Sequence, residues 1–113
     1  MTAYAIANLR NVDLGAEIQH YLLTIDDTLT PYGGRFLVHG SVPERMDGDF
    51  PGVVVVIEFA DLERAHAWYA SPEYQAIADL RVRNSEGGAV IVDGVPEGYR
   101  AASFLQQVVA PEG

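Results

Sequence analysis

The segment from Glu58 to Tyr74 constrains the fold more than any other part of the chain. It begins at the end of an unbroken apolar run, Val53–Phe59, whose β-branched residues predict a strand buried on both faces. Asp61 can accept hydrogen bonds from the first backbone amides of a helix, and so predicts a helix over Leu62–Ala70. Ser71-Pro72 then restarts the helix, because serine favours the cap and proline the first helical position. A buried strand followed by two helical segments is therefore the centre of the predicted fold.

The other elements are arranged on either side of this centre. Apolar runs predict strands at Thr2–Arg10, Arg35–Gly40 and Ala89–Asp93. Asp13 is a natural cap for a helix whose apolar residues recur every three or four positions up to Leu29. The order β-α-β-β-α-β is the ferredoxin-like pattern of the α+β class. The rules for crossovers and strand neighbours then predict a four-stranded antiparallel sheet of order 4-1-3-2, with the helices on one face.

Charge and composition exclude several partners and chemistries. The net charge is −9 and all seven basic residues are arginine, so the field opposes nucleic acid and anionic membranes. The chain has no cysteine, which excludes a thiol nucleophile, and no lysine, which excludes Schiff-base chemistry. The three histidines lie on separate predicted elements, so we expect neither a metal nor a cofactor. No apolar segment approaches the ~20 residues that cross a bilayer, and no signal peptide is evident, so a cytoplasmic protein is expected.

One face of the predicted sheet lacks a covering layer. Strand alternation places a set of apolar residues on it: Ala3, Ala5, Phe36, Val38, Val53, Val55, Val90 and Val92. The same face of a second copy would cover this surface, so a homodimer is predicted.

Three segments of the chain resemble the signature of the DUF1330 family: Tyr32–Val38, Ile57–Phe59 and Ala67–Tyr74. The resemblance spans roughly residues 2–95 and implies a dimeric α+β barrel. That superfamily includes cofactor-free monooxygenases, muconolactone isomerases and haem-degrading enzymes, whereas the function of this family is uncharacterised. We therefore expect a ferredoxin-like domain over residues 1–95. Residues 96–113 form a C-terminal extension, which we expect to pack on the partner subunit.

Arg35, His39 and Glu58 are the candidate catalytic residues. Alternation allows them to share a face on neighbouring strands, with Glu58 fixed by the arginine and the imidazole free to exchange protons. Such a group could remove and return a proton, as an isomerase or cyclase requires. The structural alternative is an Arg35–Glu58 ion pair that closes the polar end of the core.

A second set of residues forms the candidate substrate contacts: Tyr4, Asn8, Tyr32, Trp68 and Tyr74. The aromatic members could hold a flat apolar molecule, but core packing is the favoured explanation for Trp68 and Tyr74. Ser71 is interpreted as a helix cap and not as a nucleophile. A haem-degrading reading would use Asn8 and Trp68, yet Pro72–Arg83 contains no histidine to serve as the axial ligand.

Two functions remain open. The first is a cofactor-independent enzyme that transfers protons on an apolar or aromatic small molecule. The second is a non-catalytic dimeric binding or accessory protein whose pocket is filled by its own side chains. An open pocket that reaches His39 and Glu58 favours the first, and a filled core favours the second.

Overall fold

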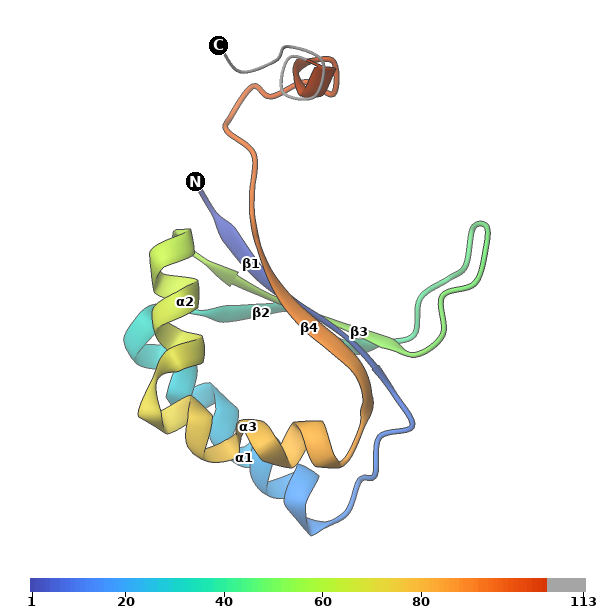
Figure 1. Ribbon diagram of the computed structural model, residues 1–113, viewed down its shortest axis with the longest axis vertical. Coiled ribbons are helices and arrows are strands. Elements are labelled where there is room, and N and C mark those ends of the chain that lie inside the picture. The colour runs from blue at the N-terminus through green and yellow to red at the C-terminus, as the bar shows by residue number, and fades with distance from the viewer. Residues whose placement is uncertain (106–113) are drawn as a thin grey trace.

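Four antiparallel strands form a single sheet in the order β2-β3-β1-β4, which is the predicted order read from the opposite edge. The strands are β1 (Ala3–Arg10), β2 (Arg35–Ser41), β3 (Val53–Phe59) and β4 (Glu86–Asp93). The helices are α1 (Ala16–Leu29), the short 3-10 turn η1 (Thr30–Tyr32), α2 (Leu62–Ala70) and α3 (Pro72–Arg83). This computed structural model describes residues 1–105. All three α-helices lie on one side of the sheet, so the ferredoxin-like α+β class is confirmed (Figure 1).

The helix starts follow the predicted capping chemistry at two of three positions. The Asp61 carboxylate accepts a hydrogen bond from the Arg64 amide at 2.8 Å, and the Ser71 hydroxyl accepts one from the Tyr74 amide at 3.2 Å. The prediction for Asp13 is wrong, because α1 begins at Ala16 after Gly15. The Asp13 carboxylate accepts a hydrogen bond from the Gly15 amide at 3.1 Å, one residue before the helix. The Asp13 amide donates to the Asn84 carbonyl at 2.8 Å, which ties the start of α1 to the end of α3.

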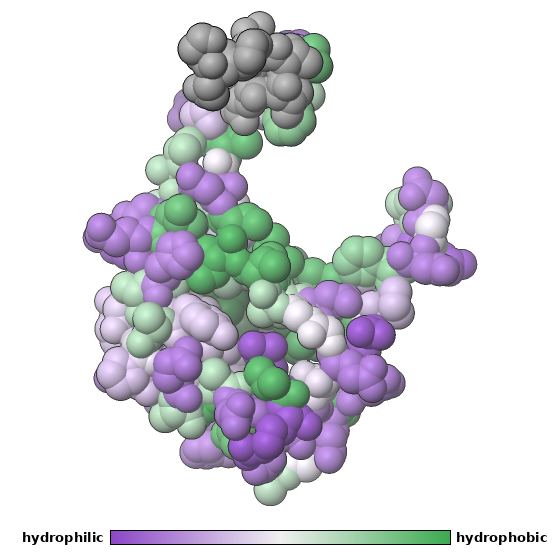
Figure 2. All heavy atoms as spheres, in the orientation of Figure 1, coloured by the Kyte–Doolittle hydropathy of each residue, from purple (hydrophilic) through white to green (hydrophobic). Residues whose placement is uncertain are grey.

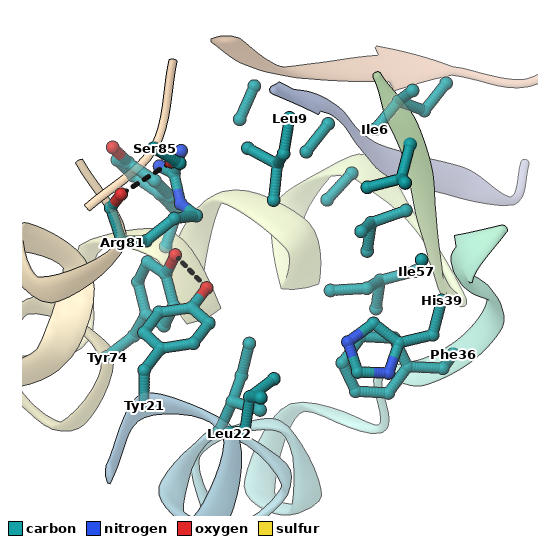
Figure 3. A pocket seen from close by; sticks show the side chains of 18 of the residues that line it. Ile6, Leu9, Tyr21, Leu22, Phe36, His39, Ile57, Tyr74, Arg81 and Ser85 are labelled. Carbon is teal, nitrogen blue, oxygen red and sulfur yellow. Dashed lines mark hydrogen bonds between the residues drawn. The ribbon is translucent and has the colours of Figure 1, made fainter. Parts of the chain in front are cut away.

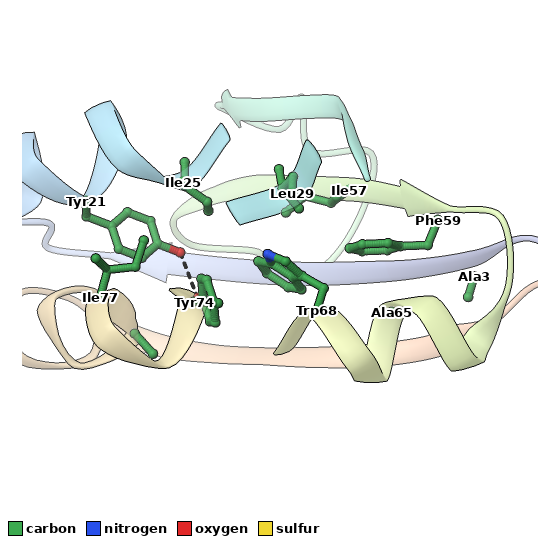
Figure 4. Packing of buried hydrophobic residues seen from close by; sticks show 11 residues of the cluster. Ala3, Tyr21, Ile25, Leu29, Ile57, Phe59, Ala65, Trp68, Tyr74 and Ile77 are labelled. Carbon is green, nitrogen blue, oxygen red and sulfur yellow. Dashed lines mark hydrogen bonds between the residues drawn. The ribbon is translucent and has the colours of Figure 1, made fainter. Parts of the chain in front are cut away.

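The hydrophobic core lies between the helices and one face of the sheet (Figure 4). Ile57 and Phe59 of β3 point into it with 4% and 0% of their surface exposed, and Trp68 and Tyr74 meet them from the helices. Gly34 is required at the end of this core, because a Cβ there would lie 2.7 Å from the Phe59 ring.

The faces that β1 and β3 turn toward the helices are the reverse of the prediction. Ala3 and Ala5 pair with Phe59 and Ile57, and all four residues pack on the helix side. The opposite, open face carries the even-numbered residues Tyr4, Ile6, Asn8, Val54, Val56 and Glu58. The physical reason is that the odd-numbered face of β3 is wholly apolar, whereas the even-numbered face includes a carboxylate whose burial would be costly.

The open face of the sheet remains largely apolar. Val38 pairs with Val56, and Val90 and Val92 of β4 pair with Ile6 and Tyr4, so these residues share one surface. Val90 and Val92 are 56% and 39% exposed. Figure 2 shows hydrophobic residues gathered between the β2–β3 hairpin and the chain that follows β4.

The chain after β4 leads away from the body of the fold (Figure 1). The extension predicted over residues 96–113 is described as far as Leu105, and residues 106–113 lie outside the described part. Among the described residues, no helix is long and apolar enough to span a membrane.

Candidate functional site

A cavity of about 770 Å³ lies between the sheet and the helices (Figure 3). Its floor comes from the helix-facing residues of the sheet, and its roof from α1, α2 and α3. The roof includes Ile18, Leu22 and Ile25 of α1. Leu22 faces the sheet but remains 41% exposed, because its side chain borders the open cavity.

Small side chains on the floor create this space. Ala5 and Ala7 of β1 face Ala89 and Ile91 of β4 across the central part of the sheet. Ala5, Ala7 and Ala89 each contribute only a methyl group, so the floor fills little of the space beneath the helices. Among the described residues this space is open, and it reaches His39 but not Glu58.

His39 lies on the wall of the cavity and stacks against Phe36, with ring centroids 4.5 Å apart and an angle of 24° between the planes (Figure 3). A β-bulge places it there. The register shifts between Phe36 and Val38, so that one extra residue, Leu37, interrupts the alternation. Phe36 and His39 consequently point to the same face of the sheet, where they pair with Ile57 and Val55 of the neighbouring strand β3.

Arg35 and Glu58 form an ion pair on the open face, on the other side of the sheet from His39. The Arg35 Nε donates to the Glu58 Oε1 at 2.8 Å, and the two side chains are 70% and 26% exposed. The predicted convergence of Arg35, His39 and Glu58 is therefore wrong. Alternation alone placed Arg35 and His39 on one face, but the bulge after Phe36 separates them. An exposed pair of this kind contributes about 0–1 kcal/mol to stability.

The predicted substrate contacts divide into two groups. Trp68 and Tyr74 line the cavity, and the Trp68 Nε1 donates to the Thr28 hydroxyl at 2.9 Å. Tyr4 and Asn8 belong to the open face, where the Asn8 side-chain amide donates to the Pro51 carbonyl at 2.9 Å. Tyr32 packs against the hydrophobic core at η1.

Sequence reasoning missed two polar residues of the cavity, Tyr21 of α1 and Arg81 of α3. The Tyr21 hydroxyl forms a hydrogen bond of 2.8 Å with the hydroxyl of the predicted Tyr74, and Arg81 lies beside them (Figure 3). Burial first, and then the neighbouring Tyr74, raise the pKa of the Tyr21 phenol, so it stays protonated at alkaline pH values where a free tyrosine ionises. Burial opposes the charge of Arg81, but the oxygens of Tyr74, Tyr21 and Tyr69 outweigh it and raise the pKa of the guanidinium.

The spacing of α3 contained a signal for Arg81. Tyr74, Ile77 and Ala78 are buried on one face of this helix, and position 81 lies seven residues after Tyr74 on the same face. An arginine at an inward-facing position is unusual, since charged side chains are rarely buried unless they are paired. Ser71, in contrast, acts as the predicted cap and donates its hydroxyl to the Trp68 carbonyl at 2.7 Å.

Titratable groups of the cavity wall are all basic or phenolic. His39, His66 and Arg81 line it together with three tyrosines, and no aspartate or glutamate among residues 1–105 does so. Within the same residues, no cluster of three histidine or carboxylate side chains is arranged to hold a metal ion.

Solved structures with the same fold cover most of the chain. A protein of unknown function from Rhodopseudomonas palustris is 11% identical, with a TM-score of 0.62, and the match covers 84% of this chain and 83% of that one. A dimeric ferredoxin-like protein of unknown function from Jannaschia sp. CCS1 is 16% identical, with a TM-score of 0.58 and coverage of 85% and 100%. A Dabb family protein with a ferredoxin-like fold from Mesorhizobium loti is 19% identical, with a TM-score of 0.55 and coverage of 86% and 97%.

No curated protein matches the sequence. The family model of the domain of unknown function DUF1330 matches residues 2–95, which is most of the chain and includes every element from β1 to β4. The resemblance of the sequence signature is thereby confirmed, and the chain belongs to the DUF1330 family.

Proposed function

We propose that this chain is a homodimeric protein that binds a small apolar or aromatic molecule in the cavity between its sheet and its helices. The observation that carries the proposal is the cavity of about 770 Å³ with mainly apolar walls. Pockets that bind small molecules occupy roughly 300–1,000 Å³ and combine apolar walls with a few polar groups. A domain of this size gains stability by packing its core tightly, so an open cavity at the centre has a cost that ligand binding explains.

Binding can be tested with N-phenyl-1-naphthylamine, a neutral aromatic probe whose fluorescence rises in apolar surroundings. Ala7→Leu fills the floor of the cavity, and should weaken probe binding at least about tenfold, because the added carbons occupy the probe's space. Ala76→Leu is the matched control, since Ala76 is exposed on α3 and the same substitution there leaves the cavity unchanged. Absence of saturable binding to the wild type, or equal binding to both variants, contradicts the proposal.

The homodimer is supported by the open face of the sheet. That surface carries the apolar residues Tyr4, Ile6, Val38, Val54, Val56, Val90 and Val92, which no described part of the chain covers with a second layer. The similar Jannaschia protein is described as dimeric. Phe104 and Leu105 in the C-terminal extension are 53% and 55% exposed, and the second copy is their proposed packing partner.

Proton transfer on the bound molecule is a second candidate function, favoured by the place of His39 on the cavity wall. Its imidazole would act without Glu58 and Arg35, which belong to the other face of the sheet. 2-Tetralone, an apolar ketone with exchangeable carbon-bound protons, is a suitable probe, and its exchange in D₂O can be followed by proton NMR.

The wild type should accelerate this exchange about a hundredfold, the lower range of general acid–base catalysis, and His39→Ala should remove the acceleration. His20→Ala is the control, because His20 is exposed on α1 and does not line the cavity. If the wild type binds N-phenyl-1-naphthylamine but does not accelerate the exchange of 2-tetralone, the non-catalytic binding function stands instead. If His39→Ala exchanges 2-tetralone as fast as the wild type does, the imidazole of His39 is not the catalytic group.

A further inference from the structure

The cavity wall has a charge opposite to that of the whole chain. The chain has a net charge of −9, yet no aspartate or glutamate among the described residues lines the cavity. Arginine and histidine are present on the wall, together with the hydroxyl groups of three tyrosines. The polar groups are thus donors and potential cations, placed in surroundings that are otherwise apolar. This arrangement favours a ligand group of negative charge.

Arg81 is the central charged group. It is half-buried at the end of the inward-facing stripe of α3 and lines the cavity. Within residues 1–105, no carboxylate lies within 4.0 Å of its guanidinium. Arg83, two positions further on, shows the contrast: it turns to the surface and binds Glu17 at 2.7 Å and Asp79 at 2.9 Å. Tyrosine oxygens are the partners of this half-buried cation and none of them is an anion, so the position of Arg81 points to a counter-ion supplied by a ligand.

The tyrosine pair supplies a further donor at the same place. Tyr21 and Tyr74 are 9% and 2% exposed, and their hydroxyl oxygens lie 2.8 Å apart. Each hydroxyl has one proton, and their mutual hydrogen bond uses only one of the two. The second proton has no acceptor among the side chains and carbonyls of the described residues. One guanidinium and one phenolic proton therefore converge at one end of an apolar cavity (Figure 3).

We propose that Arg81, with the Tyr21–Tyr74 hydroxyl pair, binds a single anionic oxygen group, such as a carboxylate, at one end of an apolar or aromatic ligand. The proposal rests on the proposed function, since it assigns the ligand class of the same cavity. A monoanion fits better than a phosphate because one arginine faces the group. The remaining wall, mainly alanine, valine, leucine and isoleucine with the rings of Phe36 and Trp68, is suited to the hydrocarbon body of the ligand.

The test compares 2-naphthoate with 2-naphthamide, which have the same ring and nearly the same shape but differ in charge. Wild-type protein should bind the carboxylate roughly ten- to a hundredfold more tightly than the amide, as expected for charge-assisted hydrogen bonds. Arg81→Met keeps the length of the side chain and should abolish this preference, while 2-naphthamide binds as tightly as before. Quenching of Trp68, the single tryptophan and a residue of the cavity wall, provides the readout.

Arg83→Met is the matched control, because it removes the same charge from the same helix but outside the cavity, and it should retain the preference. Tyr74→Phe serves as a second variant, and should reduce the preference partially by removing one hydroxyl. The proposal is overturned if the wild type binds the two compounds equally, or if the preference survives in Arg81→Met. In that case binding of N-phenyl-1-naphthylamine still decides the proposed function separately. Absence of binding for all three compounds defeats both.

Discussion

Tyr21 connects the stability of the fold with the chemistry of the cavity. Its ring packs edge-on against Tyr74 in the core, with centroids 6.1 Å apart, while its hydroxyl belongs to the polar end of the cavity. Burial raises the pKa of this phenol because the ionised form would lose its hydration. The burial of Tyr21 therefore makes the folded state sensitive to alkaline pH.

The pH dependence of unfolding should show this sensitivity. The pKa of Tyr21 is higher in the folded than in the unfolded state, so its contribution is complete below the ordinary tyrosine value of about 10 and is lost as pH rises above it. Above that value the wild type should lose up to about 1.4 kcal/mol per pH unit from this residue. In Tyr21→Phe the loss should be shallower. Urea denaturation between pH 7 and pH 11 measures it, with Tyr69→Phe, an exposed tyrosine, as the control. Identical slopes in the wild type and Tyr21→Phe contradict the assignment.

At the scale of elements, the strands and helices follow from the sequence, because their signals are local. The apolar run of β3 and the caps at Asp61 and Ser71 depend on neighbouring residues alone, and the structure reproduces them. The strand order also follows, since crossover rules leave few ways to connect β-α-β-β-α-β. The start of α1 differs from the predicted one. The Asp13 amide there forms a hydrogen bond to the distant Asn84 carbonyl, which no local sequence pattern predicts.

The faces of the strands could not be obtained in the same way. Alternation indicates which residues share a face, but not which face meets the helices. The bulge in β2 adds a second difficulty, since Leu37 carries no residue signature of an interruption. His39 consequently lines the cavity, but Arg35 and Glu58 are not its neighbours there. The alanines at 5 and 7 and the arginine at 81 were visible in the sequence, and they acquire meaning only once the sheet is known to turn its odd-numbered face toward the helices.

At the scale of the whole molecule, the two faces of the sheet have separate roles. The helix side encloses the cavity, and the open side carries a band of apolar residues across all four strands. The sheet thus divides the cavity from most of the proposed dimer interface, and of the interface residues only Ile6 and Val90 also border the cavity. A change to the open face should alter assembly while the cavity wall keeps its residues. This separation allows assembly and binding to be tested independently.

Val56→Glu should convert the proposed dimer into a monomer. Val56 lies on β3 within the open face, between Ile6 and Val38, so two copies packed through this face would bury two unpaired carboxylates. In light scattering at micromolar concentration, the wild type should have about twice the chain mass of 12.3 kDa, and the variant should have the chain mass. Val82→Glu is the matched control, because Val82 is 56% exposed on α3, away from the open face, and the same substitution there should leave the dimer intact.

A wild type that is monomeric at this concentration contradicts the dimer. If Val56→Glu is a dimer, as Val82→Glu is expected to be, the interface does not lie on the open face. Because Trp68 lies on the opposite side of the sheet, its fluorescence should be the same in both variants, which separates loss of assembly from loss of folding.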